Sequence, residues 1–189
     1  RQLDQLLHYP YGCLEQSVSS SYPWLIVGQQ QIDVFNNGTS RSAHPISREQ
    51  AMEAGIQRII KKVRSSGGFS LWSSDDPYEQ HWLTAYTTQF LIDAKTHGFA
   101  VDQQIIDKAL TRLHDYIRGR AENAERWNDD ASLYRFVYRA YAAYVLARTQ
   151  RITLTDVRCN RRSTPNDHLI CILVTTAHPF VIRQPLPPC

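Results

Sequence analysis

The spacing of apolar residues constrains the fold of this chain more than any other feature of its sequence. In several segments, apolar side chains recur every three or four positions, which is the period of an amphipathic helix. The residues that define these faces are Leu14, Val18, Tyr22, Leu25 and Ile26; Met52, Ile56, Ile59, Ile60 and Val63; Trp82, Tyr86, Phe90 and Ala94; Ile106, Ala109, Leu110, Leu113 and Ile117; and Leu133, Val137, Tyr141, Tyr144 and Val145. Strand-like alternation is essentially absent, so we predict an all-α chain of antiparallel helical hairpins.

Capping residues indicate where these helices begin and end. Ser47-Arg48-Glu49-Gln50 has the spacing of a capping box, which marks the start of the second helix. Asp102 is suited to the N-cap of the fourth helix, and either Asp129 or Asp130 to that of the fifth. Gly98 is placed to end the third helix.

Breaking residues divide the pattern further. Pro23 is expected to kink the first helix or to end it and start another. Gly67-Gly68 stops the second helix, and Phe69, Leu71 and Trp72 are then expected to turn inward from a loop and fill a core.

The octet Tyr9-Pro10-Tyr11-Gly12-Cys13-Leu14-Glu15-Gln16 points to chemistry at the start of the first helix. Residues three apart on a helix face each other, so Cys13 can reach the side-chain carbonyl of Gln16. If the thiolate attacks that amide and ammonia leaves, the product is an internal thioester. Such a bond holds an acyl group ready for an external nucleophile.

The neighbours of Cys13 suit this reaction. Gly12 has no Cβ, which allows a sharp turn and a close approach. A helix N-terminus favours a thiolate and would stabilise an oxyanion on the Gln16 carbonyl. Tyr9 and Tyr11 are expected to shield a hydrolysable bond from water. For an isolated C-x-x-Q, a structural cysteine beside a solvated glutamine is the commoner arrangement, and it is the complete octet that favours the thioester.

The octet resembles the thioester motif of bacterial alpha-2-macroglobulin-like proteins, which are related to the animal macroglobulins and the complement thioester proteins. Two further stretches match this family in the same order, Gly67-Gly68-Phe69-Ser70-Leu71-Trp72 and Trp82-Leu83-Thr84-Ala85-Tyr86. The likeness runs from about Leu3 to about Arg151.

The resemblance implies a fold and a domain organisation. Thioester domains of this family are α/α toroids, and this chain would supply about half of such a ring, followed by an irregular C-terminal tail. Residues 1–151 would then form a partial thioester domain in which Cys13 and Gln16 make the bond.

The resemblance also implies a function. A protease would cleave a bait region elsewhere in the parent protein, the thioester would become exposed, and a lysine amine of the protease would attack the Gln16 carbonyl. Each molecule would react once, so the protein would be an endopeptidase inhibitor and not an enzyme, with no cofactor. Its partners would be the target proteases and the other domains of the parent, in the bacterial periplasm or anchored to a membrane that faces it.

Residues 152–189 differ in character from the rest of the chain. The helical period stops, and three of the four cysteines, Cys159, Cys171 and Cys189, lie there without zinc-type spacing. The segment is either a divergent tail or a truncated or frameshifted reading of the parent gene, and we expect little order in it.

Histidine placement bears on the choice of nucleophile. Complement-type relatives use a downstream His that takes the acyl group and favours hydroxyl targets. The corresponding stretch here, Trp127 to Ser132, contains no His, which favours direct attack by amines. Asn128 is a candidate for lining the site, whereas His114 is expected on the surface.

Two alternatives from other functional classes remain. One is an α/α-toroid enzyme acting on isoprenoid or glycan substrates, with Asp76 or Asp130 as the acid. Both aspartates belong to acidic pairs at expected helix starts, however, where capping is the simpler role. The other alternative is a thiol peptidase with Cys13 as nucleophile and His81 or His8 as base.

Composition limits the remaining classes. The chain has 189 residues, of which 42% are hydrophobic, enough for one domain with a core. Its net charge of +3 arises from interleaved acidic and basic residues and gives little reason to propose a nucleic-acid partner. No apolar run approaches the length of a membrane span, and no metal site is predicted.

Overall fold

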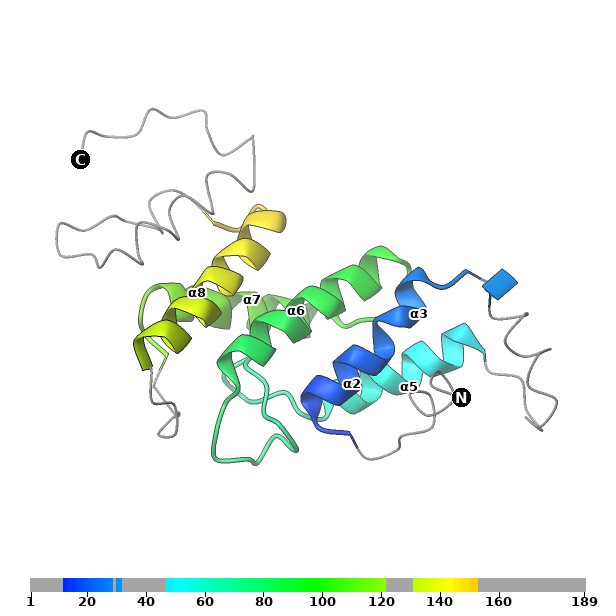
Figure 1. The fold of residues 1–189 in the computed structure, drawn as a ribbon, viewed down its shortest axis with the longest axis horizontal. Coiled ribbons are helices and arrows are strands. Elements are labelled where there is room, and N and C mark those ends of the chain that lie inside the picture. The colour runs from blue at the N-terminus through cyan, green and yellow to red at the C-terminus, as the bar shows by residue number, and fades with distance from the viewer. Residues whose placement is uncertain (1–11, 29, 32–46, 122–130, 153–189) are drawn as a thin grey trace.

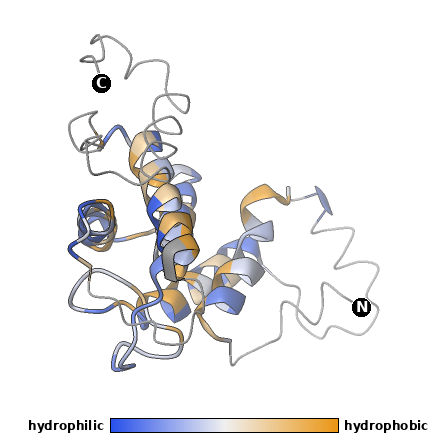
Figure 2. Ribbon diagram, turned by 60° about the vertical axis from the view of Figure 1, so that its left-hand side comes forward, coloured by the Kyte–Doolittle hydropathy of each residue, from blue (hydrophilic) through white to orange (hydrophobic). Residues whose placement is uncertain are grey.

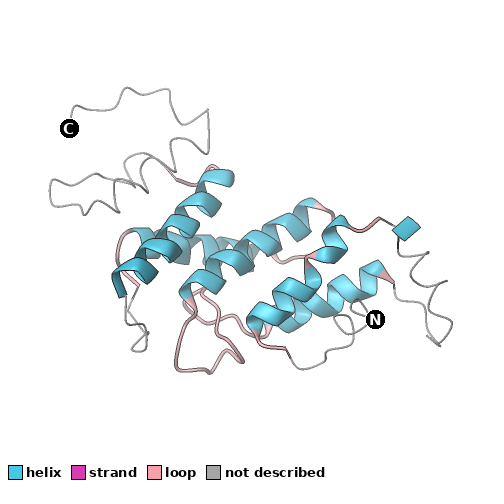
Figure 3. Ribbon diagram, in the orientation of Figure 1, coloured by secondary structure: helices cyan, strands magenta, loops and turns pink. Residues whose placement is uncertain are grey.

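The computed structural model describes residues 12–28, 30–31, 47–121 and 131–152. The helices in these ranges are α2 (Leu14–Ser21), α3 (Pro23–Ile26), α5 (Arg48–Ile60), α6 (His81–Thr96), α7 (Gln103–Ile117) and α8 (Ala131–Arg148) (Figures 1 and 3). Extended pairing in the described part is limited to two isolated antiparallel bridges, Val63 with Phe69 and Ser70 with Glu79. The predicted all-α class is confirmed.

The helix ends predicted at Ser47, Asp102 and Gly98 are confirmed. The Ser47 side chain accepts a hydrogen bond from the Gln50 backbone N–H at the start of α5. Asp102 Oδ1 accepts from the Gln104 N–H over 2.8 Å at the start of α7. Gly98, with φ +88°, follows the end of α6, where a left-handed residue closes a helix at little cost.

The first helical pattern is divided at Pro23 into α2 and α3, which confirms the prediction that Pro23 ends one helix and starts another. Pro23 occupies the first position of α3, where its missing N–H has no helical partner to lose. Leu25 faces the core, but Ile26 is 82% exposed, so its assignment to the buried face was wrong. After the break at Tyr22, Leu25 and its neighbour Ile26 point in different directions.

Helices α2 and α5 lie side by side and run in opposite directions. A Cβ on Gly55, in the middle of α5, would collide with Ser21 Oγ at the end of α2. At the other end of the pair, Arg48 Nε donates to the Trp24 carbonyl over 2.6 Å. The start of α2 therefore lies at the C-terminal end of α5.

Helix α6 is central to the described part of the fold (Figure 1). It packs against α2 on one side and against α7 and α8 on the other. The Tyr22 ring stacks on Tyr86 of α6 at a centroid distance of 5.4 Å, and Arg148 of α8 pairs with Asp93 of α6 at 2.8 Å. Along the helices, hydrophobic and hydrophilic segments alternate, as amphipathic helices require (Figure 2).

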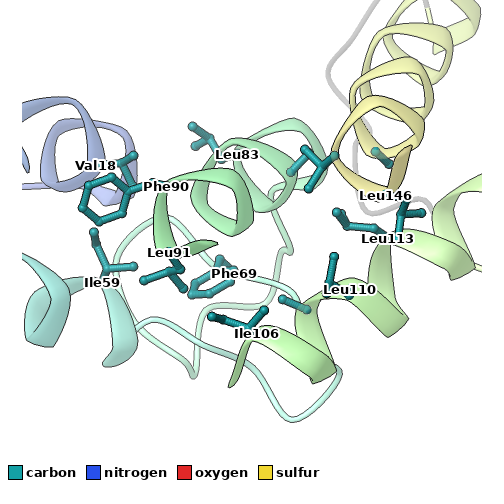
Figure 4. Close-up of a cluster of buried hydrophobic side chains, with 14 of the residues drawn as sticks. Val18, Ile59, Phe69, Leu83, Phe90, Leu91, Ile106, Leu110, Leu113 and Leu146 are labelled. Atoms are coloured by element: carbon teal, nitrogen blue, oxygen red, sulfur yellow. The ribbon is translucent and has the colours of Figure 1, made fainter. Parts of the chain in front are cut away.

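The loop between α5 and α6 delivers Phe69 into the core, as predicted. Phe69 is fully buried, and Figure 4 shows its ring among Leu91, Ile106 and Leu110. Leu71 is partly buried, but Trp72 is 62% exposed, so the inward prediction was wrong for Trp72. The loop enters the core at Phe69 and leaves it again within three residues.

The two glycines before Phe69 are required by close contacts. Gly67 has φ +89°, and a Cβ there would collide with the Lys108 carbonyl of α7. A Cβ on Gly68 would collide with the Glu79 carboxyl group. A side chain at Gly67 would push the loop away from α7, and one at Gly68 would displace the Glu79 carboxyl group.

A buried carboxylate fastens this loop to α7. Glu79 accepts hydrogen bonds from Arg112 Nε at 2.8 Å, from Ser66 Oγ at 2.8 Å and from the Tyr116 hydroxyl. Burial alone would raise the pKa of Glu79, but these hydrogen bonds outweigh burial and hold the pKa below its usual value. The charged form of Glu79 is therefore part of the folded structure.

The face predicted for α8 was wrong in most of its positions. Leu133, Val137 and Tyr144 are 55%, 46% and 42% exposed, and of the predicted face only Val145 is fully buried. The residues of α8 that pack into the core are Tyr138, Ala142, Ala143, Val145, Leu146 and Ala147. Small alanines let α8 approach α6 and α7 closely, and alanines do not stand out in a pattern based on large apolar residues.

Several predictions lie wholly or partly outside the described residues. The caps Asp129 and Asp130 are not described. Of the predicted tail, Ile152 is described and is buried against the core at 4% exposure, whereas residues 153–189 lie outside the described ranges. The proposed boundary at residue 151 stays a prediction.

Candidate thioester site

Cys13 occupies the N-cap of α2, and Gln16 is the third residue of that helix. The Cys13 backbone N–H donates to Gln16 Oε1 over 3.2 Å, and the Gln16 backbone N–H points back toward the Cys13 side chain. The reciprocal arrangement is that of a capping box, with sulfur in place of the usual hydroxyl oxygen. It brings the thiol and the carboxamide together, as their spacing predicts.

Backbone contacts fix the start of α2. The first helical N–H, from Leu14, donates to the Leu71 carbonyl over 2.7 Å. Ser17 Oγ donates to the Cys13 carbonyl over 2.9 Å, and Ser17 itself is buried. The inward loop and the first turn of α2 thus hold Cys13 from both sides.

Gly12 lies close to both residues of the site. A Cβ on Gly12 would be 3.3 Å from Gln16 Cβ and 3.3 Å from Ser17 Oγ, which is tighter than ordinary packing. The φ of Gly12 is not in the left-handed region. The absent side chain therefore gives space beside Gln16, and no unusual backbone turn is involved.

This geometry suits acyl transfer. Attack of Cys13 Sγ on the Gln16 Cδ would move negative charge onto Oε1, the atom to which the Cys13 N–H already donates. The first turn of a helix adds further N–H groups and a favourable dipole at the same place. Gln16 is exposed, whereas Cys13 is partly buried, so the glutamine is the more accessible of the two residues.

A lysine lies close enough to interact with Cys13, although no motif in the sequence singled it out. Lys62 is only 8% exposed, and its Nζ donates to the Arg58 carbonyl over 3.3 Å. Burial lowers its pKa, while the charges of Cys13 and Asp76 act in the opposite direction. The available signal in the sequence was a lysine three residues after Ile59, where the apolar stripe of α5 continues just past the end of the helix.

The other predicted site residues are not among those that the structure describes. Tyr9 and Tyr11, predicted to shield the bond, and Asn128, predicted to line the pocket, lie outside the described residues. Their roles stay predictions.

The residues needed by the two alternative functions are engaged elsewhere or lie outside the described ranges. His81 is fully buried and its ring contacts come from Tyr116 of α7 and Tyr138 of α8, at 4.9 and 4.7 Å, whereas Cys13 begins α2. His8 and Asp130 are not described.

The prediction that Asp76 caps a helix was wrong. Helix α6 begins at His81, and its N-cap is Gln80. The Asp76 carboxylate instead accepts from the Trp72 and Ser73 backbone N–H groups at 2.7 and 3.2 Å, which closes the exposed part of the loop. Asp76 is thus occupied with local backbone groups.

Two further kinds of site are absent from the described residues. No group of three or more His, Cys, Asp or Glu side chains is placed to hold a metal ion within these ranges. None of the described helices combines the length and apolarity needed to cross a membrane.

The described helical hairpins, the inward loop that buries Phe69 and the cysteine at the start of α2 agree with an α/α-toroid thioester domain, and comparison with known proteins shows that class. The family model of the A-macroglobulin TED domain matches residues 1–120. The chain is 33% identical to alpha-2-macroglobulin of Escherichia coli strain K12 over 159 residues, which cover 84% of this chain and 9% of that protein. It therefore spans less than a tenth of that relative.

Solved structures agree. The crystal structure of Salmonella alpha-2-macroglobulin reacted with methylamine superposes with a TM-score of 0.76 at 32% identity, covering 96% of this chain and 12% of that one. Trypsin-activated alpha-2-macroglobulin from Escherichia coli gives 0.73 at 29% identity, covering 89% and 12%. The chain belongs to the thioester-domain family of the A-macroglobulins, whose domains are α/α toroids, and its described helices correspond to part of such a ring.

Proposed function

We propose that Cys13 and Gln16 form an internal thioester through which the protein becomes covalently attached to proteases that attack it. In forming the bond, the Cys13 thiolate adds to the Gln16 Cδ, the C–N bond breaks, and the nitrogen leaves as ammonia. In the trapping step, an amine adds to the same carbon, the C–S bond breaks, and Cys13 is released as a thiol.

The observation that carries this proposal is the reciprocal contact between Cys13 and Gln16 at the start of α2. It holds the thiol and the carboxamide at one helix start, with a backbone N–H on the carboxamide oxygen, and this arrangement supports attack on the acyl carbon. The exposure of Gln16 gives an incoming amine access to the acyl carbon.

The family relationship supports the choice of nucleophile and target. A relative of known structure has been reacted with methylamine, and another has been activated by trypsin. We infer that a lysine of the protease is the physiological amine, that one molecule reacts once, and that the protein acts as an inhibitor and not as a turnover enzyme. The remaining domains of the parent, in a periplasmic or membrane-anchored protein, would supply the protease-sensitive segment.

The absence of His between Trp127 and Ser132 further favours amines over alcohols. With methylamine and glycerol offered at equal concentration, we expect the amide to predominate in the products measured by mass spectrometry. Predominant ester formation would show that another residue transfers the acyl group to hydroxyls.

The trapping function is tested by incubating the protein with trypsin and separating the products by denaturing electrophoresis after boiling. We expect a covalent conjugate whose junction peptide joins Gln16 to a trypsin lysine. Prior treatment with methylamine and the Cys13→Ala substitution should each abolish it. A conjugate that persists in Cys13→Ala, or no conjugate from a protein shown to carry the thioester, would contradict protease trapping.

A further inference from the structure

The antiparallel packing of α2 and α5 places a buried lysine beside the thioester site. Ser21 at the end of α2 meets Gly55 in the middle of α5. Cys13 lies eight residues before Ser21, and Lys62 lies seven residues after Gly55. At a rise of about 1.5 Å per residue, both lie about 10–12 Å from that crossing, in the same direction along the pair.

The loop between α5 and α6 independently supports the placement of Lys62 beside Cys13. Its residue Ser70 donates a backbone hydrogen bond to the Lys62 carbonyl over 3.0 Å, and its next residue, Leu71, accepts from the Leu14 N–H over 2.7 Å. Consecutive loop residues thus bind the residue at the end of α5 and the residue that follows Cys13. Lys62 and Cys13 are neighbours across the loop.

The surroundings of Lys62 are unusual for a lysine. Most lysines extend into solvent, but Lys62 is 8% exposed and its ammonium has one carbonyl partner, Arg58 O, at 3.3 Å. The charged and titratable groups that face it are Cys13 from α2, Asp76 from the loop, and Arg58 and Lys61 from its own segment. Among the described residues, Lys62 forms no ion pair within 4 Å, so a salt bridge does not account for its burial.

We propose that Lys62 is the acid–base group of the thioester site, which exchanges a proton with Cys13 during both formation and opening of the bond. The proposal deepens the thioester function and rests on it. In formation, the neutral Lys62 amine takes the proton of the Cys13 thiol, and the resulting thiolate attacks Gln16 Cδ. Lys62 then returns that proton to the departing nitrogen, which leaves as ammonia.

Opening of the bond uses the same group in the other direction. An amine adds to Gln16 Cδ and gives up a proton to neutral Lys62, the C–S bond breaks, and Lys62 passes the proton to the Cys13 sulfur. No other reactant is needed, and Lys62 ends each step as it began.

The charges around Lys62 change in a way that suits this cycle. Burial lowers the pKa of Lys62, Cys13 raises it, Arg58 lowers it further and Asp76 raises it. In the thioester the Cys13 sulfur carries no charge, so its contribution disappears and Lys62 becomes a more readily available base. Once the thiolate is released, Lys62 becomes more basic again and can hold a proton for it.

The test compares Lys62→Met with Lys61→Met, an exposed lysine next to it in the chain. Methylamine-dependent release of the Cys13 thiol is followed across pH, and rates are divided by the concentration of unprotonated methylamine. We expect the corrected rate of the parent to rise with pH as Lys62 loses its proton. Lys62→Met should be slower by on the order of a hundredfold with a flat profile. Lys61→Met should keep the rise with pH, displaced to higher pH because Lys61 no longer lowers the pKa of Lys62.

Other outcomes of this experiment are decisive. If folded Lys62→Met, checked by circular dichroism, keeps its full sequence mass while Lys61→Met loses ammonia, the formation half of the proposal is supported. A parent rate that falls with rising pH would mean that Lys62 acts only as a fixed cation, and would overturn the proposal. So would a Gln16–Lys62 crosslink, visible as a chain one ammonia lighter in which the Cys13 thiol is free.

A second measurement separates this proposal from the thioester itself. In Gln16→Ala no thioester can form, and alkylation of Cys13 by iodoacetamide reports directly on proton exchange with Lys62. We expect the pH profile of alkylation to move upward when Lys62→Met is added to Gln16→Ala. An unchanged profile would overturn the role of Lys62 whether or not the parent forms a thioester.

Discussion

Helices α2 and α5 begin with the same spacing of residues but with different atoms at the cap. Cys13-Leu14-Glu15-Gln16 starts α2, and Ser47-Arg48-Glu49-Gln50 starts α5. In α5 the Ser47 hydroxyl accepts from the Gln50 N–H over 3.5 Å and donates to the Glu49 carboxylate over 2.9 Å. In α2 the capping atom is sulfur, and the Gln16 side chain folds back onto the Cys13 N–H.

The surroundings of the two helix starts differ as well. The first helical N–H of α2 is held by the Leu71 carbonyl, and the buried Lys62 lies nearby. A thiol is a poorer hydrogen-bond acceptor than a hydroxyl but a far better nucleophile. A shared capping pattern thus serves helix stability in α5, whereas in α2 a weaker cap is combined with groups that suit acyl transfer.

The largest expected effect comes from giving the start of α2 the same capping atom as the start of α5. Cys13→Ser replaces the thiol by the hydroxyl of α5, and we expect complete loss of methylamine incorporation with helix content unchanged, because a serine is at least as good a cap as cysteine. Incorporation is measured with isotopically labelled methylamine, and helix content is measured by circular dichroism.

The reciprocal substitution, Ser47→Cys in the Cys13→Ser background, is the matched control. It places Cys-Arg-Glu-Gln at the start of α5, where none of the described residues takes the place of Leu71 or Lys62. We expect no methylamine incorporation at Gln50. Incorporation there would show that the spacing alone is sufficient and would remove the distinction between the two starts.

An intermediate effect is expected where the loop that supports α2 is fastened to α7. Glu79→Gln removes the carboxylate at 2.8 Å and leaves the partly buried Arg112 only its longer contact with Asp115, at 3.7 Å. We therefore expect the free energy of unfolding to fall by about 3 kcal/mol, measured by urea denaturation. Glu53→Gln, at an exposed position of α5, is the control and should change it little. Equal effects of the two substitutions would mean that the Glu79 anchor adds nothing.

The contribution of Glu79 to stability should also be visible in how the free energy of unfolding depends on pH. Because the folded-state pKa of Glu79 is lowered, its contribution to stability is present above the unfolded value of about 4.5 and is lost as pH falls through the folded value. The free energy of unfolding of the parent should therefore decline below about pH 4.5 more steeply than that of Glu79→Gln. Parallel curves would contradict the charged state assigned to Glu79.

The smallest effect is expected at the cap of α5. Ser47→Ala should lower the free energy of unfolding by about 1 kcal/mol, since one N–H of the first turn loses its acceptor. Cys13→Ala should cost less, because sulfur is the weaker acceptor. A larger loss at Cys13 than at Ser47 would mean that the thiol is mainly structural.

The sequence predicted those parts of the fold that depend on local chemistry. The caps Ser47 and Asp102, the break at Pro23 and the inward position of Phe69 follow from the hydrogen-bonding or conformational properties of single residues. The contact between Cys13 and Gln16 belongs to the same kind, because a helix start alone determines it.

The features that the sequence did not predict depend on contacts between distant segments. The buried face of α8 is chosen by how closely Ala142 can approach its neighbours, and Trp72 is exposed because Asp76 closes the loop back on itself. Lys62 joins the site only through the packing of α2 against α5. His81 is enclosed by aromatic rings from helices far along the chain.

The central claim is that Cys13 and Gln16 are joined by a thioester, and the most direct test is the intact mass of freshly purified protein with a thiol assay on the same sample. We predict a chain one ammonia lighter than its sequence, with Cys13 resistant to alkylation until methylamine is added. Methylamine should then release the Cys13 thiol and leave methylamide on Gln16. A chain of full sequence mass whose Cys13 is alkylated at once would contradict the claim.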